Sequence, residues 1–127
     1  MLTTENSTKL TRYDIIINML KTSKIRFVLV TCPDLETAKS LARDALTARF
    51  VGCVNVIPNI YSLFVWKDEV TEEEESLLLA KTTEGNLGKL ESLWLSRHPY
   101  DVPEFVVMKA SCANEAYEKW IECCVTN

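Results

Sequence analysis

Glycine and proline are scarce in this chain of 127 residues, which contains three glycines and four prolines. A composition so poor in both excludes a collagen-like or low-complexity chain. No apolar run approaches the roughly 18 uncharged residues that a membrane span requires. The net charge of −4 leaves no basic face for nucleic acid. With 47% hydrophobic and 25% charged residues, the sequence predicts one folded, mildly acidic domain with neither nucleic-acid nor membrane partners.

Disulfide and zinc-binding patterns are lacking as well. The five cysteines are an odd number, none forms a C-x-x-C pair, and a single histidine does not complete the usual structural zinc site. The first apolar run, residues 15–20, is short and contains Asn18, so we expect no signal peptide. We therefore predict a reducing, cytoplasmic location, in which the cysteines are small buried hydrophobes or exposed thiols.

Residues 1–24 are predicted to be an N-terminal extension of a domain formed by residues 25–127. Residues 1–10 are mostly polar, which predicts a disordered lead-in. Apolar side chains within residues 13–20 recur at helical spacing and indicate a short amphipathic helix. This helix either docks onto the domain or a neighbour, or packs loosely.

The domain begins with a strand and a helix. Residues 26–31 are β-branched and aromatic and are closed by Pro33, which indicates a buried strand. Asp34 lies in N-cap position before a helix whose apolar side chains recur over residues 35–50, and Gly52 just beyond is expected to mark its end.

Two long strands, residues 53–66 and 69–81, are predicted to be joined by a tight turn at Lys67 and Asp68. The first strand is apolar on both faces, and a domain this small has too few helices to cover so long a hairpin twice. We therefore predict that the hairpin extends beyond its own domain and is buried by other subunits. Pro58 interrupts the first strand, where it predicts a bulge or bend.

A second helix over residues 87–98, a strand over 104–110 and a last helix capped by Asn114 complete the chain. The resulting order is β-α-β-β-α-β plus a terminal helix. This order predicts an α+β protein with the ferredoxin-like fold.

Few side chains offer chemistry. The common catalytic motifs are absent, and a nucleophilic pair would require Cys32 or Cys53 to meet His98 across the fold. His98 is the one imidazole of the sequence, the side-chain type suited to proton transfer or metal binding, and it precedes Pro99 on a stiff turn. It therefore belongs either to a preorganised site or to the cap of the preceding helix.

The acidic run at residues 72–75 is open to two interpretations. In a strand, alternate carboxylates face opposite sides, so one pair turns inward and needs partners such as Lys67 or Lys81. Alternatively, the run is a solvated arm whose charge prevents edge-to-edge aggregation.

Several segments together resemble the CutA family of divalent-cation tolerance proteins. They are Cys-Val-Asn-Val-Ile-Pro at 53–58, the aromatic hairpin ending at Trp66, Lys81-Thr82, His-Pro-Tyr-Asp-Val-Pro-Glu at 98–104, and residues 117–120. The resemblance spans about residues 27–121 in the right order. It implies a ferredoxin-like protomer in a tight homotrimer whose hairpins pair between subunits, an architecture similar to the PII proteins that bind small ligands in clefts between subunits. It also implies a role in tolerance of divalent metals, copper especially, without an established catalytic activity.

The resemblance also suggests site residues. Bacterial copper-binding members have a cysteine in the first strand and a histidine pair before the Pro-Tyr, where this chain has Val30 and Arg97-His98. Only His98 carries over as a ligand for copper or another divalent cation, with Cys32 as a relocated thiolate on the same strand face as Val30.

A ligand cleft is expected between subunits. The residues expected there are Trp66, Glu75, Lys81, His98 and Tyr100. Lys81 is the candidate partner for a small anion or, as a salt bridge, for Glu75.

Three functions follow from these observations. The first is a non-enzymatic trimeric binding or signalling module of the CutA type, connected with the response to metal ions. The second is a trimeric scaffold that presents the helix of residues 13–20 to a protein partner. The third is an enzyme that uses Cys32 or Cys53 with His98.

Overall fold

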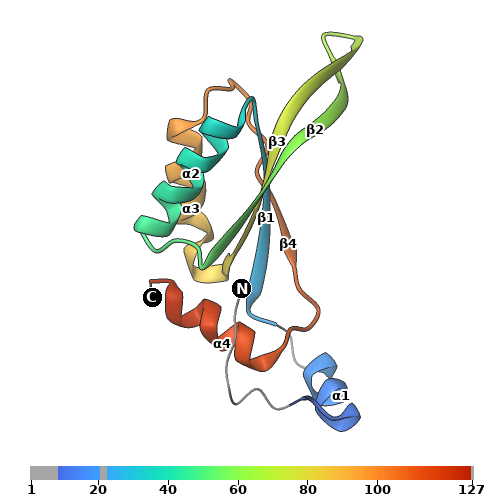
Figure 1. The fold of residues 1–127 in the computed structure, drawn as a ribbon, viewed down its shortest axis with the longest axis vertical. Coiled ribbons are helices and arrows are strands. Elements are labelled where there is room, and N and C mark those ends of the chain that lie inside the picture. The colour runs from blue at the N-terminus through green and yellow to red at the C-terminus, as the bar shows by residue number, and fades with distance from the viewer. Residues whose placement is uncertain (1–8, 21–22, 127) are drawn as a thin grey trace.

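A computed structural model describes residues 9–20 and 23–126. In this part of the chain, four antiparallel strands form one sheet in the order β2-β3-β1-β4. Helices α2 and α3 lie side by side on one face of this sheet, and α4 crosses its lower end (Figure 1). The strands are β1 (Ile25–Cys32), β2 (Cys53–Trp66), β3 (Glu69–Thr83) and β4 (Val106–Lys109). The helices are α1 (Arg12–Leu20), α2 (Leu35–Thr47), α3 (Leu87–Arg97) and α4 (Glu115–Cys124), with a short 3-10 turn at Glu84–Asn86. The predicted α+β ferredoxin-like fold is confirmed.

Capping residues set the start of two helices as predicted. Asp34 accepts a hydrogen bond from the backbone N–H of Thr37 at 2.7 Å. Asn114 accepts one from the N–H of Tyr117 at 3.1 Å. Each side chain satisfies one of the N–H groups that a first helical turn leaves without a partner.

The end of α2 differs from the prediction. The helix ends at Thr47, and the left-handed residue beyond it is Arg49, with φ 60°. Gly52 has no positive φ. Instead, a Cβ at this position would lie 2.9 Å from Cδ1 of Ile121. Gly52 is therefore required by the close approach of α4 and not by the helix end.

The hairpin of β2 and β3 confirms two local predictions. Its turn is at Lys67 and Asp68, which both have positive φ values, 50° and 65°. The ladder shifts register between Ile57 and Ile60, around Pro58, as expected for a strand residue without an N–H. Beyond this bulge the two strands continue well past the rest of the molecule (Figure 1).

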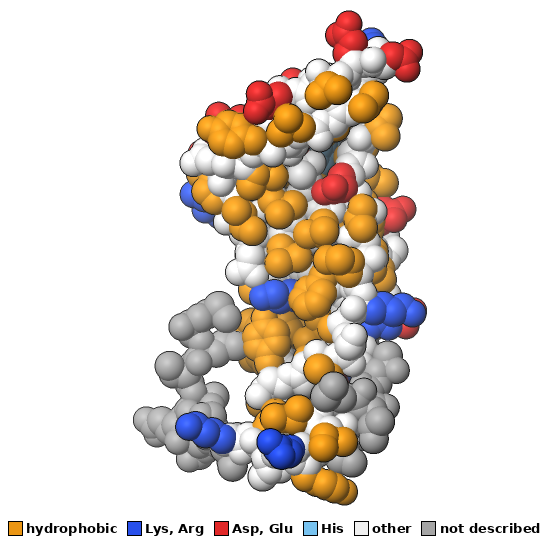
Figure 2. Space-filling model, turned by 90° about the vertical axis from the view of Figure 1, so that its right-hand side faces the viewer, with side chains coloured by type: hydrophobic (Ala, Val, Ile, Leu, Met, Phe, Trp, Pro, Cys, Tyr) orange, Lys and Arg blue, Asp and Glu red, His pale blue; other side chains and the backbone are white. Residues whose placement is uncertain are grey.

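The two faces of the sheet differ in how they are covered. Toward α2 and α3, Val28 and Val30 of β1 and Leu78 of β3 are fully buried with Trp94 of α3. On the opposite face, Val106 keeps 47% of its surface exposed. Hydrophobic side chains run over this helix-free face from the hairpin downward (Figure 2). Residues 9–20 and 23–126 of one chain therefore leave one sheet face uncovered along much of its length.

The ends of the described chain contain the remaining elements. The predicted helix near the N-terminus is present as α1, while the predicted disordered lead-in falls mostly on residues 1–8, outside the described residues. The strand predicted over 104–110 is shorter, Val106–Lys109. Within the described residues, none of the helices has the length and apolar character needed to span a membrane.

Candidate functional site

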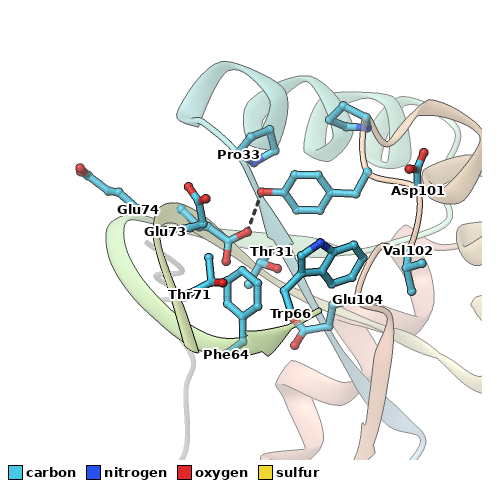
Figure 3. Close-up of a pocket in the computed structure, with 13 residues that line it drawn as sticks. Thr31, Pro33, Phe64, Trp66, Thr71, Glu73, Glu74, Asp101, Val102 and Glu104 are labelled. Carbon is cyan, nitrogen blue, oxygen red and sulfur yellow. Dashed lines mark hydrogen bonds between the residues drawn. The ribbon is translucent and has the colours of Figure 1, made fainter. Parts of the chain in front are cut away.

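A cleft of about 620 Å³ lies where the base of the hairpin arm meets the end of β1 and the loop between α3 and β4. Its size is typical of small-molecule sites. Figure 3 shows its side chains converging from these three parts of the fold. The lining residues are Thr31, Pro33, Phe64, Trp66, Thr71, Glu73, Glu74, Glu75, Pro99, Tyr100, Asp101, Val102 and Glu104.

The hairpin register decides which arm residues face this cleft. Phe64 pairs with Thr71, and Ile60 pairs with Glu75. Directly paired residues of an antiparallel ladder project to the same side, so Phe64, Trp66 and Glu75 share one face. Of the acidic run, Glu75 alone is buried, with 7% exposure, and the three carboxylates before it are exposed, so one carboxylate is buried and not the predicted pair. In Figure 3, Glu74 is directed away from Phe64.

The partner of the buried carboxylate is Tyr100, and not Lys67 or Lys81 as predicted. The Tyr100 hydroxyl donates a hydrogen bond of 2.7 Å to Oε2 of Glu75, drawn as the dashed line in Figure 3. Burial and this hydrogen bond to Glu75 raise the pKa of Tyr100 well above its usual value. The phenol therefore remains a donor, and it ties the loop after α3 to the hairpin arm.

His98 fixes the same loop from the other side. Its Nδ1 accepts a hydrogen bond from the Tyr100 N–H at 3.1 Å, so its Nε2 carries the proton and donates to the carbonyl of Thr31 at 2.8 Å. The His98 and Tyr100 rings lie 4.7 Å apart between centroids. The imidazole thus joins the loop to β1 and does not bind the carbonyls of the preceding helix. His98 is also the C-cap residue of α3, where its backbone N–H donates to the carbonyl of Trp94, and its role in a preorganised site stays a prediction.

The other candidate metal ligand lies in the core. Cys32 is fully buried on the face that packs against α2 and α3, the same face as Val30, as predicted. Burial, with the nearby carboxylates Asp34 and Glu75, raises the pKa of its thiol to about 12. A thiol with this pKa stays protonated near neutrality and is a poor nucleophile or ligand.

The neighbours of His98 and Cys32 do not leave these side chains free to hold a metal ion. Both ring nitrogens of His98 are already hydrogen-bonded, and Arg97 forms an ion pair with Asp44 across α2 and α3. Among the described residues, no three histidine, cysteine or acidic side chains are grouped so that they would hold a metal ion. The described part of a single chain therefore does not offer a preformed copper site, and ligation by His98 and Cys32 stays a prediction.

Lys81 lies away from the cleft. Its Nζ is 5.7 Å from the ring centroid of Tyr117 in α4, a cation–π contact. Lys81 lies six positions beyond Glu75 along β3, roughly 20 Å in an extended chain. The structure thus brings together Trp66, Glu75 and Tyr100 of the predicted cleft, with His98 behind them, and leaves Lys81 at the other end of the sheet.

Phe64 and Glu104 are two of the lining residues that the sequence did not place in the cleft. Phe64 shares the arm face of Trp66, and the period of two along β2 would have found it. Glu104 follows the second proline of the loop, and only the folded loop places it beside the arm. Burial, and the charge of Glu75, raise the pKa of Glu104. Fold and cleft together define a ferredoxin-like α+β protein with a long hairpin and an acidic, ligand-sized cleft.

Known proteins share this fold and sequence pattern. Residues 26–124 match the family model described as CutA1 divalent ion tolerance protein, and the chain therefore belongs to this family. The divalent-cation tolerance protein CutA of Thermus thermophilus is 38% identical over 94 residues, which are 74% of this chain and 91% of that protein. A CutA homologue from Xenopus laevis is 38% identical over 92 residues, 72% of this chain and 61% of that protein. A crystal structure of CutA1 from Oryza sativa has a TM-score of 0.79 at 32% identity and covers 83% of this chain and 96% of that chain.

Proposed function

We propose that this CutA1-family chain is a non-enzymatic homotrimer that binds a small ligand or metal ion in clefts between subunits, as part of the response to divalent metals. The observation that carries the proposal is the helix-free face of the sheet. Ile57 of β2 keeps 43% of its surface exposed there, and Val106 and Met108 of β4 keep 47% and 42%, so apolar side chains are exposed at both edges of this face. Contiguous apolar surface of this kind is typical of an interface between proteins.

The hairpin arm supports the same assembly. Tyr61, Leu63 and Val65 of β2 are 68%, 65% and 70% exposed on the arm face opposite the cleft. A strand that is apolar on both faces requires cover on both, and the described residues supply none for the outer one. The number of subunits, three, follows from the family resemblance. Because the cleft lies at the base of the same arm, neighbouring subunits would enclose it.

The proposal that the protein is not an enzyme is supported by the two candidate nucleophiles, of which Cys53 pairs with Lys81 at the other end of the sheet. The Cys32 thiol is buried with a pKa of about 12, and His98 holds two structural hydrogen bonds. A reducing, cytoplasmic location is supported by the five cysteines, all in the described part of the chain and all free thiols.

The mass of the protein in solution tests the proposal. We expect about three times the chain mass of 14.5 kDa by light scattering and native mass spectrometry. Val106→Glu places a charge on the helix-free face and should dissociate the assembly. Leu46→Glu is the matched control, since Leu46 is similarly exposed, at 42%, but lies on α2. A monomeric wild type, or an intact trimer for Val106→Glu, would contradict the proposal.

A second function, the scaffold, is favoured by one observation. On α1, Tyr13, Ile15 and Ile16 are 71%, 47% and 50% exposed. A helix that leaves such side chains uncovered suits a protein partner. Deletion of residues 1–24 separates the two functions, because a scaffold would lose its partner in a pull-down, whereas the cleft would still bind its ligand.

A further inference from the structure

The cleft at the base of the arm has a strong charge imbalance. Five carboxylates line it, from Glu73, Glu74, Glu75, Asp101 and Glu104, and none of its described lining residues is a lysine, arginine or histidine. Each carboxylate raises the cost of ionising its neighbours. A positively charged ligand would lower this cost, whereas an anion, the ligand expected from Lys81, would increase it.

Of these five carboxylates, Glu75 is the one that most needs a positively charged partner. It is 7% exposed, and its one side-chain hydrogen bond among the described residues comes from the neutral Tyr100 hydroxyl. Its neighbours Glu73 and Glu104 are acidic, and it makes no ion pair within the described chain. A buried carboxylate without a cation is costly, so the cleft is prepared for one that comes from outside.

Aromatic rings form a second part of the cleft wall. Phe64 and Trp66 come from the arm and Tyr100 from the loop (Figure 3). Trp66 is 51% exposed although it faces a cleft, so its indole surface is available to a ligand. The faces of such rings attract ammonium and guanidinium groups, and tryptophan does so most strongly.

A bare divalent ion fits these walls less well. Such ions require about six oxygen ligands in close contact, and the described residues hold no group of three suitable side chains. The volume of about 620 Å³ is also far larger than one ion, and prolines and Val102 supply apolar lining.

We propose that the cleft lined by Phe64, Trp66, Glu75, Tyr100 and Glu104 binds a small organic cation, an ammonium or guanidinium compound. The carboxylate of Glu75 pairs with the charged head, and the indole of Trp66 covers its apolar surface. The inference rests on the proposed function only in placing this cleft between subunits, since every group named belongs to one chain.

Calorimetry with the full chain in an amine-free phosphate buffer tests the proposal. The probes are choline and putrescine, and the control ligand is the neutral carbon isostere of choline, in which a tert-butyl group replaces trimethylammonium. We expect saturable binding of at least one cation and none of the isostere. Glu75→Gln keeps an acceptor for Tyr100 but removes the charge, and should weaken binding by about tenfold or more.

Matched variants on the other arm face complete the test. Trp66→Leu should weaken binding several-fold, whereas Tyr61→Leu and Glu72→Gln should leave it unchanged, since neither of these two residues lines the cleft. The inference is overturned if neither cation binds, if the isostere binds equally well, or if Glu72→Gln weakens binding as much as Glu75→Gln. Native mass spectrometry of the same samples separates the two proposals: a trimer that binds no cation overturns this inference alone, and a monomer that binds one overturns only the assembly.

Discussion

The hydroxyl of Tyr100 and the carboxylate of Glu75 meet at 2.7 Å, across 25 residues of sequence. This hydrogen bond joins the loop after α3 to the base of the hairpin arm, and both residues line the cleft. It makes the position of the arm and the shape of the cleft depend on one another.

Tyr100→Phe removes the donor and leaves a buried carboxylate without its partner. We expect the free energy of unfolding to fall by about 2 kcal/mol, since hydrogen bonds to charged groups contribute more than neutral ones. Urea denaturation measures the change. Tyr61→Phe is the control, because Tyr61 is 68% exposed on the opposite face of the arm and its loss should have no effect. Equal stability of the two variants would contradict the importance of the pair.

Copper binding is decided by the state of His98 and Cys32. A copper ion at His98 must displace either Thr31 or the Tyr100 N–H, and one at Cys32 must displace a proton held with a pKa of about 12. We therefore expect native mass spectra of the desalted, reduced protein to show no retained copper. One copper per subunit in the wild type, lost in His98→Gln, would contradict this and establish His98 as a ligand.

Stability at alkaline pH reports on Cys32. The pKa of this thiol is raised from 9.0 to about 12 in the folded state, so the folded chain binds more protons than the unfolded chain in this window. The free energy of unfolding is therefore unaffected by this group below pH 9 and falls as the pH rises toward 12. Between pH 9 and about 10.5 the loss from Cys32 should be about 2 kcal/mol.

The variant Cys32→Ala isolates this contribution because it retains every other alkaline group. It should be less stable at neutral pH, yet lose less stability over the same pH range. Identical slopes for the two proteins would show that the thiol titrates normally. Alkylation at pH 8 gives a second measurement, in which the exposed Cys112 and Cys123 should react long before Cys32.

The C-terminal end is held by a buried side chain. Asn86, which is 2% exposed, donates to the carbonyl of Thr126 at 2.8 Å and accepts from its hydroxyl at 2.9 Å. Asn86→Ala should cost about 2–3 kcal/mol, because it leaves these buried groups without partners. Thr126→Val removes only the hydroxyl bond and should cost less. A loss below about 0.5 kcal/mol for Asn86→Ala, the range of ordinary surface changes, would show that this contact is dispensable.

Local features of the fold were predictable because their causes lie within a few residues. The caps at Asp34 and Asn114, the turn at Lys67 and Asp68, and the bulge at Pro58 each follow from one side chain and its neighbours. The end of α2 was placed wrongly, since Arg49 adopts the left-handed conformation that was expected of Gly52. Gly52 is instead required by its close contact with α4, and the neighbouring sequence does not show that contact.

For this protein, the sequence by itself determined the order of strands and helices, the family and three of the cleft residues, Trp66, Glu75 and Tyr100. Only the tertiary structure decided that Glu75 pairs with Tyr100, that His98 holds the carbonyl of Thr31, and that Lys81 lies over Tyr117. The physical reason is distance along the chain: these partners are separated by 25 to 67 residues. Residue type and alternation fix which way a side chain points, but the partner it meets depends on how the sheet and its loops close in space.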